Sequence, residues 1–258
     1  MKLLIDTTSQ IITVESETGV QTHGLYTKEA FELISRQWLR VGIAQKYSYT
    51  FSWLGRPVIQ LPEDLIRVQE VVHRVRPDVI VETGVAHGGS LVYYASLCKL
   101  MDHGRVIGVD VALRPQNRDA LAAHPLRPWI TLVDGDSTDP GVVEHVASLI
   151  APGERVLVVL DSNHTKAHVA AELEAYHPLV TPGSYIIAAD GVMQTAHDVP
   201  RGDPSWAHDH PAAAAAAFAS RHPEFVVEQP RWPFNESALT ENVTYWPGAW
   251  LRRLEITR

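Results

Sequence analysis

The stretch Val79-Ile-Val-Glu-Thr-Gly-Val-Ala-His-Gly-Gly-Ser90 predicts a β-strand that runs through a glycine-rich turn into a helix. The apolar residues 79–81 end at Glu82, glycines stand at 84, 88 and 89, and Leu91 opens an apolar pattern at helical spacing. Glycine lets the backbone approach a ligand, and the first turn of a helix presents unpaired N–H groups to negative charge. The stretch therefore predicts the nucleotide pocket of an open α/β sheet or, more simply, a tight strand-to-helix turn without a ligand.

A second predicted strand, Arg105-Val-Ile-Gly-Val-Asp110, also ends in an acid and favours the nucleotide interpretation. In nucleotide-binding sheets an acid at this position accepts hydrogen bonds from the ribose hydroxyls. The glycine spacing, Glu-x-Gly-x-x-x-Gly-Gly-Ser, differs from the Gly-x-Gly-x-x-Gly pattern of dinucleotide enzymes, which disfavours a nicotinamide oxidoreductase. Glu82 suits a cationic group better than a pyrophosphate, and S-adenosylmethionine carries both an ammonium and a sulfonium.

Composition and charge exclude several classes of protein. The chain has 258 residues, enough for one sizeable α/β domain with additions, and its net charge of −8 argues against nucleic acid or an anionic membrane as a partner. Cys98, the one cysteine, excludes an intrachain disulfide and is expected in the core. The start, Met1-Lys-Leu-Leu-Ile-Asp6, is too short and too polar for a signal peptide, so we expect a cytoplasmic protein. We also expect a homo-oligomer, in which the N-terminal residues could form a subunit contact.

Strand and helix patterns alternate regularly after residue 79. This alternation predicts a parallel sheet with right-handed crossovers, in which ligands bind at the carboxyl ends of the strands. Capping aspartates are common at such ends, but acids at all five indicate a site: Glu82, Asp110, Asp134 with Asp136, Asp161 and Asp190. Strands are predicted at 79–83, 105–110, 130–134, 155–161, 184–190, 225–228 and 249–255, and helices near 90–101, 116–123, 140–149, 166–178 and 212–220.

The residues before the sheet are predicted to form an N-terminal cap region. We expect a two-stranded hairpin within residues 3–14, a helix from the N-cap Thr27 to about residue 44, an irregular segment over 46–51, and a helix from Pro62 to about residue 75. The chain is therefore divided into residues 1–75, a hairpin and helical cap, and residues 76–258, a cofactor-binding domain. Long polar loops near 194–211 and 230–247 are expected to contact the substrate.

Three motifs resemble the cephalosporin hydroxylase / rhamnosyl O-methyltransferase family of class I S-adenosylmethionine-dependent methyltransferases. They are Phe51-Ser-Trp-Leu-Gly-Arg-Pro-Val-Ile-Gln-Leu-Pro-Glu-Asp64, Arg76-Pro-Asp-Val-Ile-Val-Glu-Thr-Gly-Val-Ala-His-Gly-Gly-Ser90 and Leu160-Asp-Ser-Asn-His-Thr165. The resemblance covers residues 46–191 and implies a Rossmann-like α/β sheet of seven strands, the last of them antiparallel. The N-terminal hairpin and the residues after 191 offer nothing to match. The sequence also offers no defensible two-histidine, one-carboxylate spacing of the kind that non-haem iron oxygenases use.

The resemblance also implies roles for individual residues. His164 stands where the similar catechol-type O-methyltransferases carry a lysine base, so the resemblance makes it the general base, with Asp161 and Asp190 as the other catalytic residues. An unperturbed imidazole pKa of about 6.5 suits a base near neutral pH. His164 could instead simply cap the following helix. The cofactor-binding residues would be Glu82, Gly84, Ala86, Gly88 and Ser90 in the glycine loop, Asp110 at the ribose, Asp136 and Ser137 at the adenine, and Asp161 beside the sulfonium.

Substrate contacts are expected from His164 and Asp190 and from the first long loop. In that loop His197, Asp198 and His208 cluster with further acids, although the segment could equally be a mobile, solvated lid. His168 lies four residues after His164, a spacing that would suit a transition metal on one helix face. We expect His168 at the helix surface instead.

The end of the fifth strand, Ala188-Ala-Asp-Gly191, departs from the metal-dependent relatives, which place two ligands there. Asp161 and Asp190 alone could hold magnesium only weakly, since this ion requires about six oxygen ligands, and metal-independent chemistry is favoured. Because an amine gains less from a metal than a hydroxyl does, N-methylation of an aminoglycoside-type sugar is slightly favoured over sugar O-methylation in a secondary metabolite such as an antibiotic. The alternative is an accessory protein of an antibiotic-tailoring hydroxylase system, which would bind the cofactor without chemistry of its own.

Overall fold

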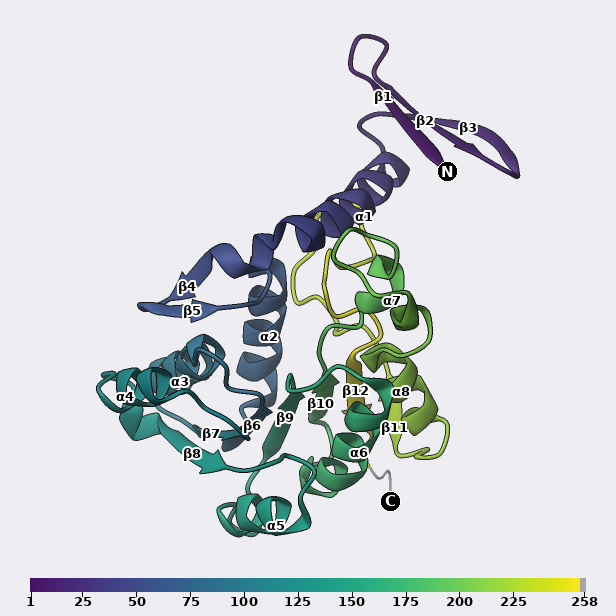
Figure 1. The fold of residues 1–258 in the computed structure, drawn as a ribbon. Helices are drawn as coiled ribbons and strands as arrows, with labels where there is room; N and C mark the ends of the chain where they lie inside the picture. Colours follow the sequence, from purple (N-terminus) through teal and green to yellow (C-terminus); the bar gives the residue numbers. More distant parts are fainter. Residues whose placement is uncertain (256–258) are drawn as a thin grey trace.

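The computed structural model describes residues 1–255, and a seven-stranded sheet lies at its centre (Figure 1). The strands follow the spatial order β11-β12-β10-β9-β6-β7-β8. Strands β6 to β10 are parallel, and β12 runs antiparallel to both of its neighbours. This arrangement confirms the predicted α/β class with a last strand that is antiparallel. The strands are β6 (Val79–Thr83), β7 (Arg105–Asp110), β8 (Ile130–Asp134), β9 (Val156–Leu160), β10 (Tyr185–Ala188), β11 (Phe225–Val227) and β12 (Trp250–Arg253).

Helices cover both faces of this sheet, as its apolar strands require. Every residue of β6 and β9 is buried, which is typical of parallel strands packed on both sides. Since successive side chains of a strand alternate, Ile80 packs in one core with α2 and α3, whereas Val79 and Val81 pack in the other with α5, α6 and α8. Cys98 is buried in the first core, as expected. The helices are α2 (Pro62–Val75), α3 (Gly89–Met101), α4 (Pro115–Ala122), α5 (Pro140–Ser148), α6 (Lys166–Tyr176) and α8 (Pro211–Ala219).

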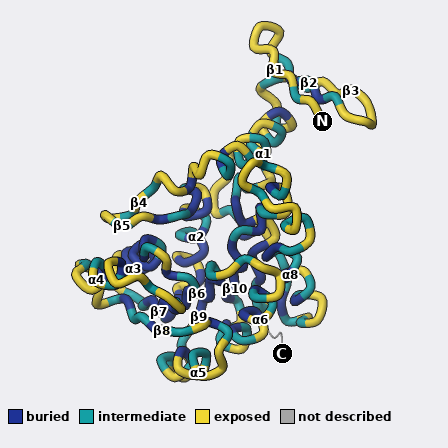
Figure 2. The backbone as a smooth tube through the Cα atoms, viewed as in Figure 1, coloured by how far each residue is buried: buried dark blue, intermediate teal, exposed yellow. Residues whose placement is uncertain are grey.

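The N-terminal residues form a separate antiparallel sheet that projects from the body at the far end of α1 (Figure 1). It consists of β1 (Lys2–Asp6), β2 (Ile11–Ser16) and β3 (Gly19–Gly24), so the predicted two-stranded hairpin lacks one strand that the structure has. The prediction missed β3 because this strand is almost entirely exposed, and no apolar alternation marks it (Figure 2). Gly19, at a φ of 131°, makes the turn into it.

The segment between α1 and α2 is more ordered than its sequence indicates. Helix α1 (Lys28–Gln45) begins at the predicted N-cap, where the Thr27 hydroxyl accepts a hydrogen bond from the Ala30 N–H at 3.4 Å. A 3-10 turn (Tyr47–Thr50) and a hairpin of β4 (Phe51–Trp53) and β5 (Arg56–Val58) follow it. A Cβ atom on Gly89 would lie 2.0 Å from the Pro57 carbonyl oxygen, so β5 packs directly on the start of α3. The hairpin thereby forms a wall beside the glycine loop.

The long loop near residues 194–211 contains short helical turns. Helix α7 (Met193–Ala196) and a 3-10 turn (Pro204–Ala207) lie side by side, and α7 also contacts α1. The two remaining 3-10 turns in the described residues are Arg127–Trp129 and His177–Leu179. Within residues 1–255, none of the helices combines the length and the apolar character that a membrane crossing requires.

Candidate active site

Three neighbouring cavities follow the carboxyl ends of the parallel strands. Cavity A, of 290 Å³, lies at the ends of β7 and β8; cavity B, of 200 Å³, lies at the glycine loop; and cavity C, of 300 Å³, lies between the end of β10 and the segment around residues 43–61. Gly84 and Ser162 line both A and B, and Gln60, His164 and Asp190 line both B and C. Because they share lining residues, the three cavities adjoin one another in a row.

The glycine loop holds a conformation that its sequence makes possible. Gly84 has a φ of 87°, and a Cβ atom there would lie 2.1 Å from the Asp161 carbonyl oxygen, so the loop passes directly against the end of β9. Ala86 also has a left-handed φ of 47°, which is costly for a residue with a Cβ atom. One oxygen of Asp110 accepts the N–H groups of Val85 and Ala86 at 2.9 and 3.1 Å. Asp110 therefore fixes this loop besides lining cavity A.

Glu82 and Ser90 lie at the base of cavity B. Ser90 lines the cavity and donates a hydrogen bond of 2.8 Å to the Glu82 carboxyl, which is completely buried behind it. The other carboxyl oxygen, Oε1, has no hydrogen-bond partner among the described residues. Burial raises the pKa of Glu82 to about 8. Glu82 thus lies one layer behind the cavity wall, and Gly88 packs its backbone against the Leu121 side chain instead of facing the cavity.

Both predicted adenine-side residues line cavity A, Asp136 at its exposed edge and Ser137 deeper inside. The Asp136 carboxylate accepts hydrogen bonds from the backbone and hydroxyl of Thr138, which lower its pKa. Ser137 donates to the buried Glu172 at 2.5 Å. His168 also lines this cavity, with its Nε2 atom 3.3 Å from the Ser137 hydroxyl, so the expectation that His168 faces the helix surface is wrong. Its attraction to Glu172, one turn along α6, orients the ring inward.

Asp161, His164 and Asp190 meet where cavities B and C join. One donor atom from each lies within 4.8 Å of the others, and His164 Nε2 is 3.4 Å from an Asp190 oxygen. Burial and the neighbouring Asp190 carboxylate raise the pKa of Asp161. Asp190 has a φ of 60°, a strained conformation of the kind that collects at functional sites. This set could hold a divalent cation through three ligands, of which the sequence analysis had counted only the two carboxylates.

The predicted substrate residues of the long loop lie outside these cavities. His197 Nδ1 is 2.8 Å from the Gln194 carbonyl oxygen, Asp198 forms an ion pair of 2.8 Å with Arg40, and His208 is exposed. Arg201 and Trp206 of the same loop line cavity C instead. A sequence does not show which side of an irregular loop faces inward, and no periodic pattern distinguishes these residues. Sequence reasoning also missed further residues that line cavity C: Lys46, Tyr49, Gln60, Tyr245 and Trp246.

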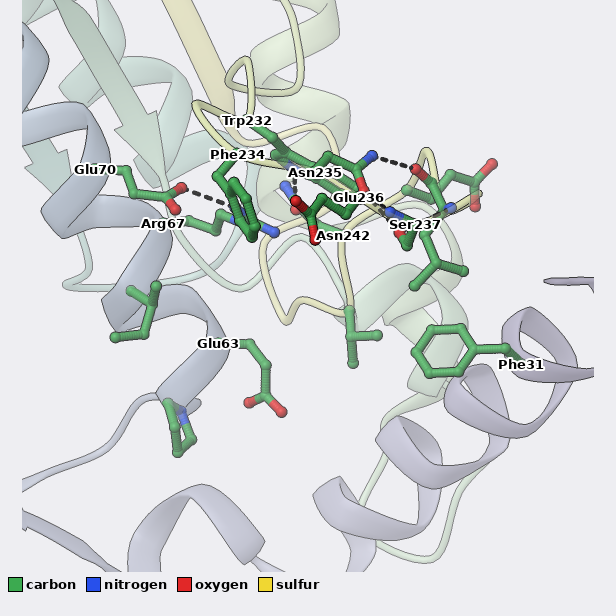
Figure 3. Close-up of a pocket in the computed structure, with 15 residues that line it drawn as sticks. Phe31, Glu63, Arg67, Glu70, Trp232, Phe234, Asn235, Glu236, Ser237 and Asn242 are labelled. Atoms are coloured by element: carbon green, nitrogen blue, oxygen red, sulfur yellow. Dashed lines mark hydrogen bonds and ion pairs between the residues drawn. The ribbon is translucent and has the colours of Figure 1, made fainter. Parts of the chain in front are cut away.

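The second long loop forms a different and larger cavity with α2 (Figure 3). This cavity has a volume of 830 Å³ and contains none of the predicted site residues. The Arg67 guanidinium lies 4.5 Å above the Trp232 ring, and the Trp232 N–H donates to Asn242 at 2.6 Å, so the loop is held against α2. Buried Asp64 accepts the Tyr245 N–H at 2.9 Å and positions the end of the loop, which reaches cavity C.

Comparison with known proteins identifies the family. The model of the family described as Rhamnosyl O-methyltransferase/CmcI matches residues 45–254, and the chain belongs to this family. The match confirms the predicted family and extends beyond residue 191, where the sequence analysis found nothing to match. Among the relatives is a rhamnosyl O-methyltransferase of Mycobacterium bovis (strain BCG / Pasteur 1173P2), 31% identical over 131 residues, or 49% of this chain and 51% of that protein. One from Mycobacterium leprae (strain TN) is 28% identical over 157 residues, 59% of this chain and 65% of that protein.

The chain therefore spans about half to two thirds of the length of these curated relatives. Solved structures agree on the fold. An apo structure of CmcI aligns with a TM-score of 0.53 at 21% identity, covering 80% of this chain and 77% of that one. CmcI with Mg and SAM also gives 0.53, at 19% identity over 80% and 78% of the two chains. An O-methyltransferase from Bacillus cereus in complex with SAH gives 0.50, at 16% identity over 74% and 81%.

Proposed function

We propose that this member of the Rhamnosyl O-methyltransferase/CmcI family transfers a methyl group from S-adenosylmethionine to a sugar hydroxyl of a small-molecule glycoside. The observation that carries the proposal is the row of adjoining cavities A, B and C along the carboxyl ends of the strands. Cavities A and B together suit an elongated nucleoside with an amino-acid tail. Cavity C opens beside that tail and is lined by aromatic and polar side chains, which suits a sugar.

The residues of cavities A and B fit the cofactor. Asp110 and Asp136 would face the ribose and the adenine, and Gly84, Ala86 and Ser90 would border the methionine portion. Glu82 lies behind Ser90 and keeps a buried Oε1 with no partner among the described residues, and a donor group of the methionine portion would satisfy this oxygen. When bound, S-adenosylmethionine supplies a methyl group on a sulfonium, whose carbon–sulfur bond breaks as the acceptor oxygen attacks.

Asp161, His164 and Asp190 would act on the acceptor at the junction of cavities B and C. The acceptor hydroxyl must lose its proton, and either the imidazole or a carboxylate of this group could accept it. The same three residues would hold a magnesium ion, with waters completing its coordination, and the ion would lower the pKa of a bound hydroxyl. Gln60, which donates to Asp161 at 3.4 Å, would orient that carboxylate.

The comparisons favour oxygen as the methyl acceptor. Both curated relatives are named O-methyltransferases, so the slight preference for N-methylation of an aminoglycoside-type sugar receives no support, and neither does the alternative of an accessory protein. The third donor, His164, also weakens the argument that led to an amine, because that argument rested on a set of only two metal ligands.

Transfer of labelled methyl groups to a panel of glycosides tests this proposal. The panel pairs each hydroxylated sugar with its amino-sugar analogue, and mass spectrometry locates the added methyl group. We expect label on a hydroxyl oxygen. Label on nitrogen alone would restore the N-methylation hypothesis. Calorimetry with S-adenosylhomocysteine tests the cofactor separately, and an absence of binding at high micromolar ligand would contradict the whole proposal.

A further inference from the structure

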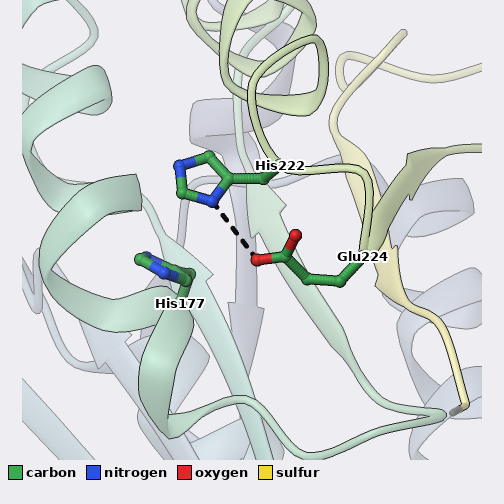
Figure 4. A group of neighbouring side chains, drawn as sticks. All are labelled: His177, His222 and Glu224. Atoms are coloured by element: carbon green, nitrogen blue, oxygen red, sulfur yellow. Dashed lines mark hydrogen bonds and ion pairs between the residues drawn. The ribbon is translucent and has the colours of Figure 1, made fainter.

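A second group of potential metal ligands lies at the opposite edge of the sheet from the candidate active site. His177 follows α6 and precedes β10, while His222 and Glu224 lie in the turn between α8 and β11 (Figure 4). These strands begin there, whereas cavities A, B and C lie where the strands end. One donor atom from each of the three side chains lies within 4.8 Å of the others.

The hydrogen bonds of His177 leave one ring nitrogen available. Its Nδ1 atom lies 3.1 Å from the Leu173 carbonyl oxygen and 3.0 Å from that of Glu174. A carbonyl oxygen only accepts hydrogen bonds, so Nδ1 must carry the proton. The neutral ring therefore presents the lone pair of Nε2. A backbone carbonyl bound to the second nitrogen is the usual outer partner of a metal-binding histidine.

His222 is oriented in a comparable way by a carboxylate. Its Nε2 atom lies 3.1 Å from Glu174 Oε2, and Arg221 donates to the other oxygen of that carboxylate, Oε1, at 2.9 Å. Its Nδ1 atom lies 3.3 Å from Glu224 Oε1. In the neutral ring with the proton on Nε2, Nδ1 and the carboxylate oxygen are two acceptors that face each other. Such a pair needs a positive charge between or beside them, either a second proton on the ring or a cation.

The spacing of one donor pair suits a tetrahedral transition-metal ion, and the third donor lies within 4.8 Å of both. Metal–nitrogen and metal–oxygen bonds of about 2.0–2.1 Å at tetrahedral angles place two donors roughly 3.3 Å apart. The Nδ1 atom of His222 and the Oε1 atom of Glu224 already have this separation of 3.3 Å. The His177 and His222 rings have centroids 4.6 Å apart, and the stacking of His222 on Phe218 fixes its ring plane.

We propose that His177 Nε2, His222 Nδ1 and a Glu224 oxygen bind one zinc ion, with a water molecule as the fourth ligand. The ion would connect the end of α6 to the α8–β11 turn and stabilise that edge of the sheet. Glu174 would act as a positioning residue through His222. Two imidazoles and one carboxylate favour zinc over magnesium, which prefers oxygen ligands.

Zinc binding measured in the full chain tests the site. All measurements use the variant His164→Gln as the parent protein. This variant lacks the histidine of the group formed by Asp161, His164 and Asp190, so that zinc binding there does not interfere. Competition with a chromophoric chelator gives the zinc affinity, and thermal melting gives the stabilisation. We expect one site that raises the melting temperature, and no response to magnesium at this cluster. Added His177→Gln or Glu224→Gln should abolish that site, and added Glu174→Gln should weaken it by roughly 10–100-fold.

Melting curves in EDTA control for folding. If the variants melt like the parent in EDTA, any difference with zinc reports the site itself. Histidines are numerous in this chain, so weak zinc binding that is unchanged in His177→Gln and Glu224→Gln would overturn the proposal. Absence of saturable binding would overturn it equally, and would indicate that contacts with Glu174 and Glu224 alone hold the His222 ring. Added His103→Ala, at a separate surface histidine paired with Asp78, is the matched control and should bind zinc like the parent.

Discussion

Asp110 combines two tasks in one carboxylate. Besides lining cavity A, it accepts backbone N–H groups from Val85, Ala86 and Ala112, so it fixes the glycine loop before any ligand is present. We predict that Asp110→Ala weakens the binding of S-adenosylhomocysteine by about 1–3 kcal/mol, since ligand hydroxyls and loop N–H groups both lose an acceptor. Calorimetry measures the affinity, and Asp110→Asn, which keeps one acceptor oxygen, should lose less. An affinity equal to wild type in the alanine variant would show that Asp110 has no part in the site.

At the residue level, sequence reasoning can place side chains that stand at the end of a strand. Asp110, Asp161 and Asp190 end predicted strands and Asp136 follows one, and parallel strands bring their carboxyl ends to one edge, so their proximity could be predicted. His197, Asp198 and His208 were selected for their chemistry alone. Which loop residues reach cavity C depends on contacts with α1 and α2, such as Arg40 with Asp198, 158 residues apart in the chain, and no local pattern encodes those contacts.

The glycine loop offers a matched pair of substitutions at the level of the element. Gly84 and Gly55 have nearly equal φ angles, 87° and 85°, but a Cβ atom at Gly84 would clash with the Asp161 carbonyl oxygen, whereas Gly55 has open space. We predict that Gly55→Ala lowers the free energy of unfolding by about 1–2 kcal/mol, which is the cost of a left-handed backbone conformation for a residue with a Cβ atom. Gly84→Ala should cost distinctly more and weaken cofactor binding, because the loop must move away from β9. Denaturant unfolding and calorimetry measure the two quantities, and equal losses in both variants would contradict this account.

The elements that sequence reasoning found and missed differ in burial. Strands such as β6 and β9 are apolar throughout, and α1 carries a capping threonine, so periodicity and cap chemistry identify them. Strand β3 is almost entirely exposed, and β4 and β5 have only three residues each. These strands form through pairing with a neighbour or packing on α3. Such elements depend on tertiary contacts, which one sequence does not display.

Buried acids make the stability of the whole molecule depend on pH. Burial raises the pKa of Asp64 to about 7 and that of Glu82 to about 8, both above the values of an unfolded chain. A raised carboxyl pKa means that the folded state holds the proton more tightly, so stability is greatest when both groups are protonated and falls as pH rises through these values. Each group should contribute a slope of up to about 1.4 kcal/mol per pH unit.

We therefore predict that the free energy of unfolding decreases between about pH 5 and pH 8. Burial lowers the pKa of His210, so this residue makes the folded state more stable as pH rises towards the ordinary imidazole pKa. The decrease in the free energy of unfolding should therefore be clearest above that pH. Asp64→Asn and Glu82→Gln, each of which replaces a carboxyl by a neutral group of similar shape, should flatten the profile. Denaturant melts across this pH range measure the effect. A wild-type profile that rises towards pH 8, or variants with unchanged slopes, would show that these carboxyls ionise without cost.

The metal requirement of turnover depends on how cavities B and C join. The sequence favoured metal-independent chemistry because the end of the fifth strand offers only Asp190, but the structure adds His164 to the pair of carboxylates within 4.8 Å. Because three metal-ligand atoms meet here and the proposed methyl acceptor is a hydroxyl, we predict that EDTA abolishes turnover and that magnesium restores it. His164→Ala should lower kcat by roughly 10²–10⁴, since it removes a ligand or a base, with nearly unchanged affinity for S-adenosylhomocysteine.

EDTA would also remove an ion held by His177, His222 and Glu224, so the rescue step matters. Magnesium should restore activity equally in wild type and in His177→Gln, because nitrogen ligands at the distant edge do not select that ion. Rescue by zinc but not by magnesium, lost in His177→Gln, would attribute the requirement to the structural cluster instead. Full activity in EDTA would show that the reaction needs no metal. His164 or Asp190 would then act as the base that takes the proton from the hydroxyl that is methylated.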